Sequence, residues 1–98
     1  MHPAFLIIGL GNPGKEYEGT RHNIGFQVVE LLAEKFGASP WKEQQKFSGE
    51  VAEAKIGNRS VLLAKPLTFM NRSGEMVEKL LSFYKLDPAT HLLVLCDD

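Results

Sequence analysis

His22 and Asp97 are the side chains of this sequence best suited to acid–base chemistry. His22 directly precedes a stretch with helical apolar spacing, and the positive end of a helix dipole helps to keep an imidazole neutral and able to accept a proton. Asp97 follows an apolar strand, and in open α/β sheets site residues gather at the carboxyl ends of strands. A carboxylate that accepts one ring N–H would fix the tautomer of the histidine. On position alone, the alternatives are a surface first-turn histidine and a carboxylate that caps a helix or turn.

Two asparagines, Asn12 and Asn71, offer uncharged amide groups in predicted loops. Each follows a predicted strand, and an amide supplies both a donor and an acceptor. Such groups suit the recognition of a peptide end. The alternatives are an Asx turn at Asn12 and a helix cap at Asn71.

Tyr17, Phe69 and Met70 add apolar surface beside these polar groups. An aromatic ring can stack on an unpaired nucleic-acid base, so the aromatic members could contact RNA. Core packing is the alternative for Phe69 and Met70. Tyr17 lies in a polar loop flanked by glycines, where a core position is harder to explain.

The pattern Gly9-x-Gly11-x-x-Gly14 matches the dinucleotide fingerprint after a predicted strand. In that fingerprint a helix begins at once beneath the pyrophosphate. Here Pro13, Gly19 and Gly25 interrupt the chain, and helical spacing begins only near residue 24. The acidic residue expected at the end of a second strand is also missing. A nicotinamide-binding module and a simple Gly-Pro turn are therefore alternatives to a substrate-binding loop.

The hydrophobic pattern predicts an α/β domain. Residues 4–10 form an apolar run typical of a central strand, and residues 91–96 form a second buried strand. Residues 50–64 read as a hairpin that turns at Gly57-Asn58. Residues 41–47 show no clear period. Two helices are predicted. The first is capped by Thr20, and its apolar face consists of Ile24, Val28, Leu31, Leu32 and Phe36. The apolar face of the second consists of Met76, Val77, Leu80, Leu81 and Tyr84.

These elements predict one domain over residues 1–98, a twisted mixed sheet flanked by helices. The last strand is strongly apolar and is followed by Asp97 and Asp98 alone. A buried strand needs cover, so we expect the domain to be incomplete at its carboxyl end.

The composition bounds the function classes further. A formal charge of −1 and a pI near 6.3 lack the basic footprint of a general nucleic-acid binder, so RNA contacts would be local. A single cysteine, Cys96, cannot build a disulfide framework, which favours a cytoplasmic protein. The first residues carry no basic segment, and their apolar run is too short for a signal peptide or membrane span.

Three ordered segments resemble the motifs of bacterial peptidyl-tRNA hydrolases. The first is Gly9-Leu10-Gly11-Asn12-Pro13-Gly14 followed by Tyr17 and Thr20-Arg21-His22-Asn23-Ile24-Gly25. The second is Lys65-Pro66-Leu67-Thr68-Phe69-Met70-Asn71-Arg72-Ser73-Gly74, and the third begins at Leu93-Val94-Leu95-Cys96-Asp97-Asp98. The family's chain continues beyond the third motif to a further catalytic asparagine and a basic carboxy-terminal part, which this sequence lacks.

The resemblance implies an enzyme that hydrolyses the ester between a peptide and tRNA, with no cofactor and no metal, as a cytoplasmic monomer. It implies that His22 is the general base, that Asp97 orients it, and that Asn12 distinguishes a blocked amino group from a free one. It further implies that Asn71 contacts substrate near the ester. Tyr17 and Phe69 would lie at the tRNA end, with Met70 beside them. A non-catalytic fragment that binds the tRNA end or the peptide would carry the same motifs and is the main alternative.

Overall fold

The computed structural model describes residues 3–10, 24–47, 49–66 and 74–95. The strands are β1 (Phe5–Gly9), β2 (Lys42–Gln44), β3 (Gly49–Ile56), β4 (Arg59–Pro66) and β5 (Leu92–Leu95). The helices are α1 (Ile24–Lys35), the 3-10 turn η3 (Gln45–Phe47), α2 (Gly74–Tyr84) and the short α3 (Pro88–His91).

The strands form one mixed five-stranded sheet in the order β2-β3-β4-β1-β5. β1 pairs in parallel with β4 on one side and with β5 on the other, which confirms its prediction as a central strand. β2, β3 and β4 pair in antiparallel fashion. The predicted hairpin is confirmed: β3 and β4 are joined at Gly57-Asn58, and Gly57 has a φ of 65°, which glycine adopts without strain.

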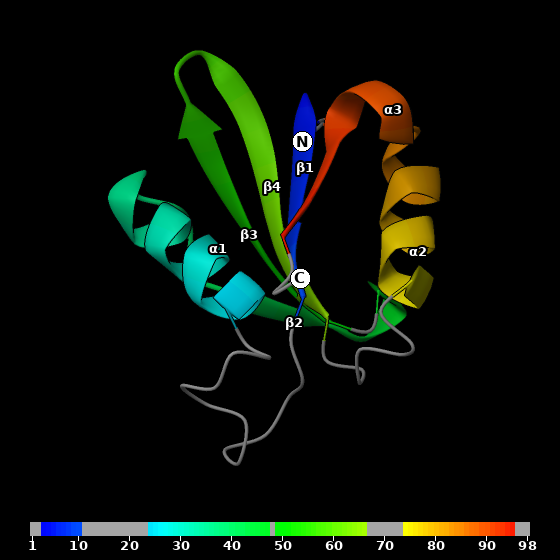
Figure 1. Ribbon diagram of the computed structural model, residues 1–98, viewed down its shortest axis with the longest axis horizontal. Helices are drawn as coiled ribbons and strands as arrows, with labels where there is room; N and C mark the ends of the chain where they lie inside the picture. Colours follow the sequence, from blue (N-terminus) through cyan, green and yellow to red (C-terminus); the bar gives the residue numbers. More distant parts are fainter. Residues whose placement is uncertain (1–2, 11–23, 48, 67–73, 96–98) are drawn as a thin grey trace.

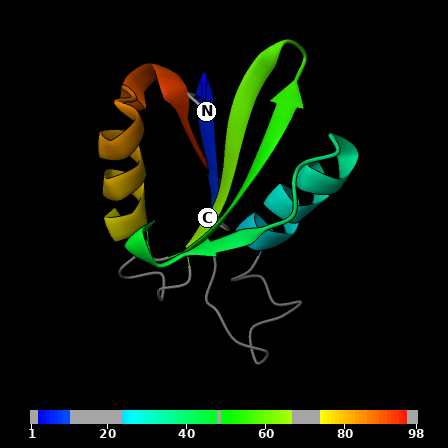
Figure 2. The same ribbon diagram turned by 180° about the vertical axis from the view of Figure 1, so that it is seen from behind.

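The two long helices cover opposite faces of the sheet, as Figures 1 and 2 show. Alternation along β1 and β4 divides their apolar side chains between the faces. Leu6 and Ile8 pack with α2 through Met76 and Leu80. Ile7 packs on the other face with Val29 of α1. This three-layer arrangement confirms the predicted fold class.

The predicted apolar face of α1 was wrong by one position. Val29 is fully buried, whereas Leu31 is 63% exposed. Apolar residues at 28, 29, 31 and 32 fit two overlapping helical faces. The observed rotation packs Val29, Leu32 and Phe36 towards the sheet. The Thr20 cap lies outside the described residues.

The prediction of a buried strand over residues 91–96 was also wrong in part. His91 ends α3, and β5 spans Leu92–Leu95. Leu93 and Val94 are exposed because β5 is the edge strand of the described sheet, where it pairs with β1. Residues 41–47, which had no assignment, contain β2 and η3, and Phe47 joins the core on the α2 face. None of the helices described is long and apolar enough to cross a membrane.

Candidate functional site

The predicted site residues lie outside the described residues. The structure describes the strands and helices that flank their segments. These residues are Asn12, Tyr17, His22, Phe69, Met70, Asn71 and Asp97. Gly11 and Gly14 of the glycine-rich pattern also lie outside the described residues, whereas Gly9 is the last residue of β1.

The described residues that flank the three motifs meet at one end of the sheet. β1, β4 and β5 run parallel, so their carboxyl ends lie together, with Ile8 opposite Ala64 and Gly9 opposite Leu95. Both α1 and α2 begin at this same end and run back along the sheet (Figure 1). The chain therefore leaves this end three times, after Leu10, Pro66 and Leu95, and returns to it at α1 and α2. We take this end of the sheet as the candidate site.

Gly9 and Gly25 bring the end of β1 and the start of α1 into backbone contact. A Cβ on Gly9 would overlap the carbonyl oxygen of Gly25 and lie 2.9 Å from Cγ2 of Val29. Real Cβ atoms do not approach backbone this closely, so glycine is required at position 9. The contact places the beginning of α1, which directly follows the segment with His22, against the strand that precedes Asn12.

A similar contact fixes the start of α2 on the opposite face. A Cβ on Gly49 would lie 2.5 Å from Sδ of Met76 and 2.6 Å from the carbonyl oxygen of Lys65. Gly49 also pairs with Pro66 in the sheet register. The end of β4 and the first turn of α2, which flank the second motif, are therefore held by the same close packing.

Lys65 is the buried charged residue among those described, and sequence reasoning did not single it out as a site residue. Its Nζ lies 2.8 Å from Oε2 of Glu30 and 3.6 Å from Oε1 of Glu50. The same Nζ lies 4.3 Å from the centre of the Trp41 ring, within cation–π range. A sequence signal existed, because a lysine at the end of an apolar strand, opposite Glu50 in a hairpin, would have to find a partner.

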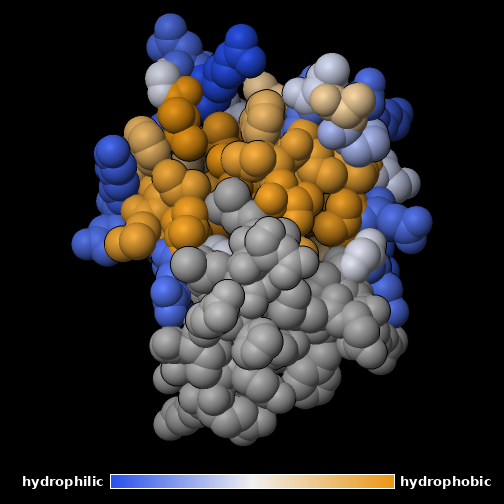
Figure 3. Space-filling model, viewed as in Figure 1, coloured by the Kyte–Doolittle hydropathy of each residue, from blue (hydrophilic) through white to orange (hydrophobic). Residues whose placement is uncertain are grey.

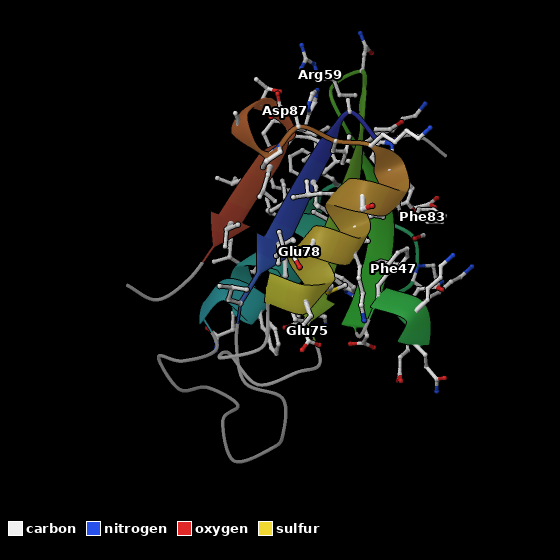
Figure 4. The ribbon with its side chains drawn as sticks, turned by 90° about the vertical axis from the view of Figure 1, so that its right-hand side faces the viewer. Phe47, Arg59, Glu75, Glu78, Phe83 and Asp87 are labelled. Atoms are coloured by element: carbon white, nitrogen blue, oxygen red, sulfur yellow. The ribbon has the colours of Figure 1, made fainter. Side chains whose placement is uncertain are left out.

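Two further features do not include the strand ends that flank the motifs. A hollow of about 430 Å³ is lined by Phe47 and Phe83, with Lys46 stacked 4.3 Å from the Phe83 ring centre. Figure 4 shows Phe47 and Phe83 beside each other and to one side of α2. His91 lies in α3, where its Nδ1 is 2.9 Å from Oγ1 of Thr90 and 3.2 Å from the backbone N of Asp87. Asp87 lies at the opposite end of the molecule from Glu75, which is in the first turn of α2 (Figure 4).

Comparison with known proteins identifies the family. The peptidyl-tRNA hydrolase family model matches residues 6–98, which contain the first two motifs and the beginning of the third. The chain belongs to the peptidyl-tRNA hydrolase family. It is 51% identical over 94 residues to the peptidyl-tRNA hydrolase of Alkaliphilus metalliredigens, covering 96% of this chain and 49% of that protein. The corresponding protein of Rhodopirellula baltica is 50% identical over 93 residues, covering 95% of this chain and 47% of that protein.

Solved structures give the same result. The crystal structure of the peptidyl-tRNA hydrolase from Acinetobacter baumannii superposes with a TM-score of 0.86 at 45% identity, over 96% of this chain and 47% of that chain. A structure of a peptidyl-tRNA hydrolase in complex with N-propanol gives the same TM-score at 44% identity. The chain thus spans about half the length of the relatives that it matches.

The family assignment confirms the resemblance found in the motifs. The roles of the seven site residues stay predictions.

Proposed function

We propose that a protein carrying this chain hydrolyses the ester bond between tRNA and a peptide or an N-blocked amino acid. The observation that carries this proposal is the family match over residues 6–98 at about half identity to named peptidyl-tRNA hydrolases. The fold supports this proposal, because the segments that bear the proposed catalytic groups all follow strands that end at one end of the sheet.

The proposed reaction is direct hydrolysis by water. The neutral imidazole of His22 takes a proton from a water molecule, and the water oxygen attacks the ester carbonyl carbon. The tetrahedral intermediate collapses as the bond to the ribose oxygen breaks, and the imidazolium returns the proton to that oxygen. The products are a peptide with a free carboxyl group and tRNA with a free ribose hydroxyl. Asp97 accepts the other ring N–H and stabilises the imidazolium.

The remaining site residues bind the two halves of the substrate. The amide of Asn12 pairs with the blocked amino group of the peptide, and Asn71 contacts the substrate near the ester. Tyr17 and Phe69 stack against the terminal base of the tRNA, and Met70 adds apolar surface beside them. The partner is therefore peptidyl-tRNA, which the protein would meet as a monomer in the cytoplasm.

Tests of function require a full-length chain. We define the completed enzyme as a full-length protein whose first 98 residues are these, for example a chimera joined to the carboxy-terminal half of the Alkaliphilus metalliredigens relative. Release of free peptide from peptidyl-tRNA by the completed enzyme supports the proposal. Binding of peptidyl-tRNA without release would support the non-catalytic alternative. Quenching of Trp41 fluorescence by NAD, with no hydrolysis, would support the dinucleotide alternative.

A further inference from the structure

We propose that Lys65 is a positioning residue for the hydrolysis reaction, acting through its ion pair with Glu30. This inference rests on the proposed function. Lys65 would fix the spacing between the end of β4, which leads into the segment with Phe69 and Asn71, and helix α1, which follows the segment with His22.

The Lys65 ammonium is enclosed by groups from three parts of the chain. Its side chain is only 10% exposed, and its Nζ is hydrogen-bonded at 2.8 Å to Glu30 of α1. Glu50 of β3 lies 3.6 Å away, and the Trp41 ring covers the charge at 4.3 Å. Two carboxylates and an aromatic face offset the loss of water around the buried cation. The ammonium is therefore held in one place.

The Lys65–Glu30 pair joins two elements that lead into or out of the proposed site. Lys65 is the penultimate residue of β4, so the chain enters residues 67–73 directly after Pro66. Glu30 lies in the middle of α1, whose first turn is already packed against β1 through Gly25. The Gly9–Gly25 contact fixes one point of α1 on the sheet, and the Lys65–Glu30 pair fixes a second. Together with the packing of Val29, Leu32 and Phe36 on the sheet, these contacts restrain both the position and the tilt of the helix.

Helix tilt matters for catalysis because the proposed base His22 lies on a different segment from the proposed substrate contacts Phe69 and Asn71. A misplacement of about 1 Å between reacting groups can lower turnover by up to about 10²-fold. A pair that holds α1 against β4 should therefore act on kcat. Substrate affinity should change less, because the proposed tRNA contacts of Tyr17 and Phe69 each stay on their own segment.

A role in stability alone makes a different prediction. Removing the pair would then lower the melting temperature but leave kcat of the folded enzyme unchanged. Glu30 offers the cleaner variant, because its side chain is 52% exposed and Glu30→Gln keeps its size. Glu34→Gln is the matched control, since it removes an exposed carboxylate one turn later on the same helix.

The experiment measures kcat, KM and melting temperature of the completed enzyme on N-acetyl-aminoacyl-tRNA. The variants are Glu30→Gln, Lys65→Met, the double variant, Lys65→Arg and the Glu34→Gln control. We expect Glu30→Gln and Lys65→Met each to lower kcat by roughly 10-fold with KM within about twofold, consistent with a sub-ångström shift. The double variant should lose no more than the worse single variant, because both remove the same pair. Lys65→Arg should retain most of kcat, and Glu34→Gln all of it.

The inference is overturned if Glu30→Gln keeps kcat within twofold of the unmodified enzyme, or if Glu34→Gln lowers kcat as much as Glu30→Gln does. If Lys65→Met does not fold, the Glu30→Gln result decides alone. Absence of hydrolysis by the unmodified completed enzyme would instead contradict the proposed function. An active enzyme with insensitive variants would contradict only the role of Lys65.

Discussion

Gly9 and Gly25 are in backbone contact across the junction of β1 and α1, with no room for a methyl group between them. This contact joins the two elements that flank residues 11–23, where the proposed base His22 and the substrate contact Asn12 lie. The geometry of the first motif therefore depends on glycine at position 9.

Gly9→Ala should destabilise the completed enzyme by about 1–3 kcal/mol, the usual cost of adding a methyl group to a closely packed site. The new Cβ would force α1 away from β1, so activity should fall as well. Chemical denaturation measures the free energy of unfolding. Gly74→Ala is the matched control, because nothing lies within 4 Å of a Cβ at that position. Equal stability of the two variants would show that α1 moves freely to accept the methyl group.

The completed enzyme should hydrolyse N-acetyl-aminoacyl-tRNA and spare free aminoacyl-tRNA. The amide of Asn12 can form a hydrogen bond with a blocked amino group. A free ammonium would lose its hydration beside this uncharged group without gaining an opposite charge, so it should bind less well. Initial rates on acetylated and unacetylated forms of one aminoacyl-tRNA measure this selectivity. Asn12→Ala should reduce the difference. Equal rates for the two substrates with the unmodified enzyme would contradict the role of Asn12.

Residues 1–98 alone should have less than a tenth of the activity of the completed enzyme. Figure 3 shows apolar side chains spread over the face between α1 and α2. Leu31, Leu93 and Val94 are among the exposed large hydrophobic residues of the chain. Leaving a large aliphatic side chain in water forgoes about 1.5–3 kcal/mol of burial. The open edge of β5 in the described sheet also invites association. Asp97 lies two residues beyond this strand, so imprecise placement of β5 would impair its proposed hydrogen bond with His22.

The test of that prediction is a peptidyl-tRNA cleavage assay on both proteins, with circular dichroism to measure folding. Adding Leu93→Ser and Val94→Ser to the isolated chain should improve its solubility without restoring activity. Activity of residues 1–98 within tenfold of the completed enzyme would show that the three motifs are a sufficient catalytic unit.

Stability should fall above pH 10 partly through Tyr84. Burial raises the pKa of the Tyr84 phenol above its ordinary value of 10.0, and the nearby Glu53 carboxylate raises it further. The neutral phenol therefore contributes stability that is fully present below pH 10. This contribution is lost as the pH rises through the folded-state pKa, because the unfolded phenol ionises first. The free energy of unfolding of Tyr84→Phe should decline less steeply above pH 10 than that of the unmodified enzyme, and parallel curves would contradict this assignment.

Most of the fold could be predicted from the sequence because its signals are local. The apolar run of β1, the Gly57-Asn58 turn and the spacing of α2 each reflect short-range chemistry. The rotation of α1 could not be predicted in this way. Its sequence fits two faces, and the choice of Val29 over Leu31 depends on packing against a distant strand.

The same difference between local and long-range signals applies to the site residues. The motifs were sufficient to indicate the family, because three ordered segments are specific together. The contacts of Lys65 were not predicted. Its partners Glu30, Trp41 and Glu50 become its neighbours only in the folded sheet. The roles proposed for His22 and Asp97 follow from the family resemblance and the chemistry of their side chains, and they call for direct tests.

The most direct test of the account is the turnover of His22→Ala in the completed enzyme on N-acetyl-aminoacyl-tRNA. A positioned general base usually contributes about 10²-fold to 10⁴-fold, so kcat should fall by that factor while substrate binding survives. His91→Ala is the matched control, because His91 lies in α3 and is bonded locally to Asp87 and Thr90. We expect a loss of at least about 10²-fold for His22→Ala and almost none for His91→Ala. Turnover of His22→Ala within about threefold of the unmodified enzyme would contradict the assignment of His22 as the base.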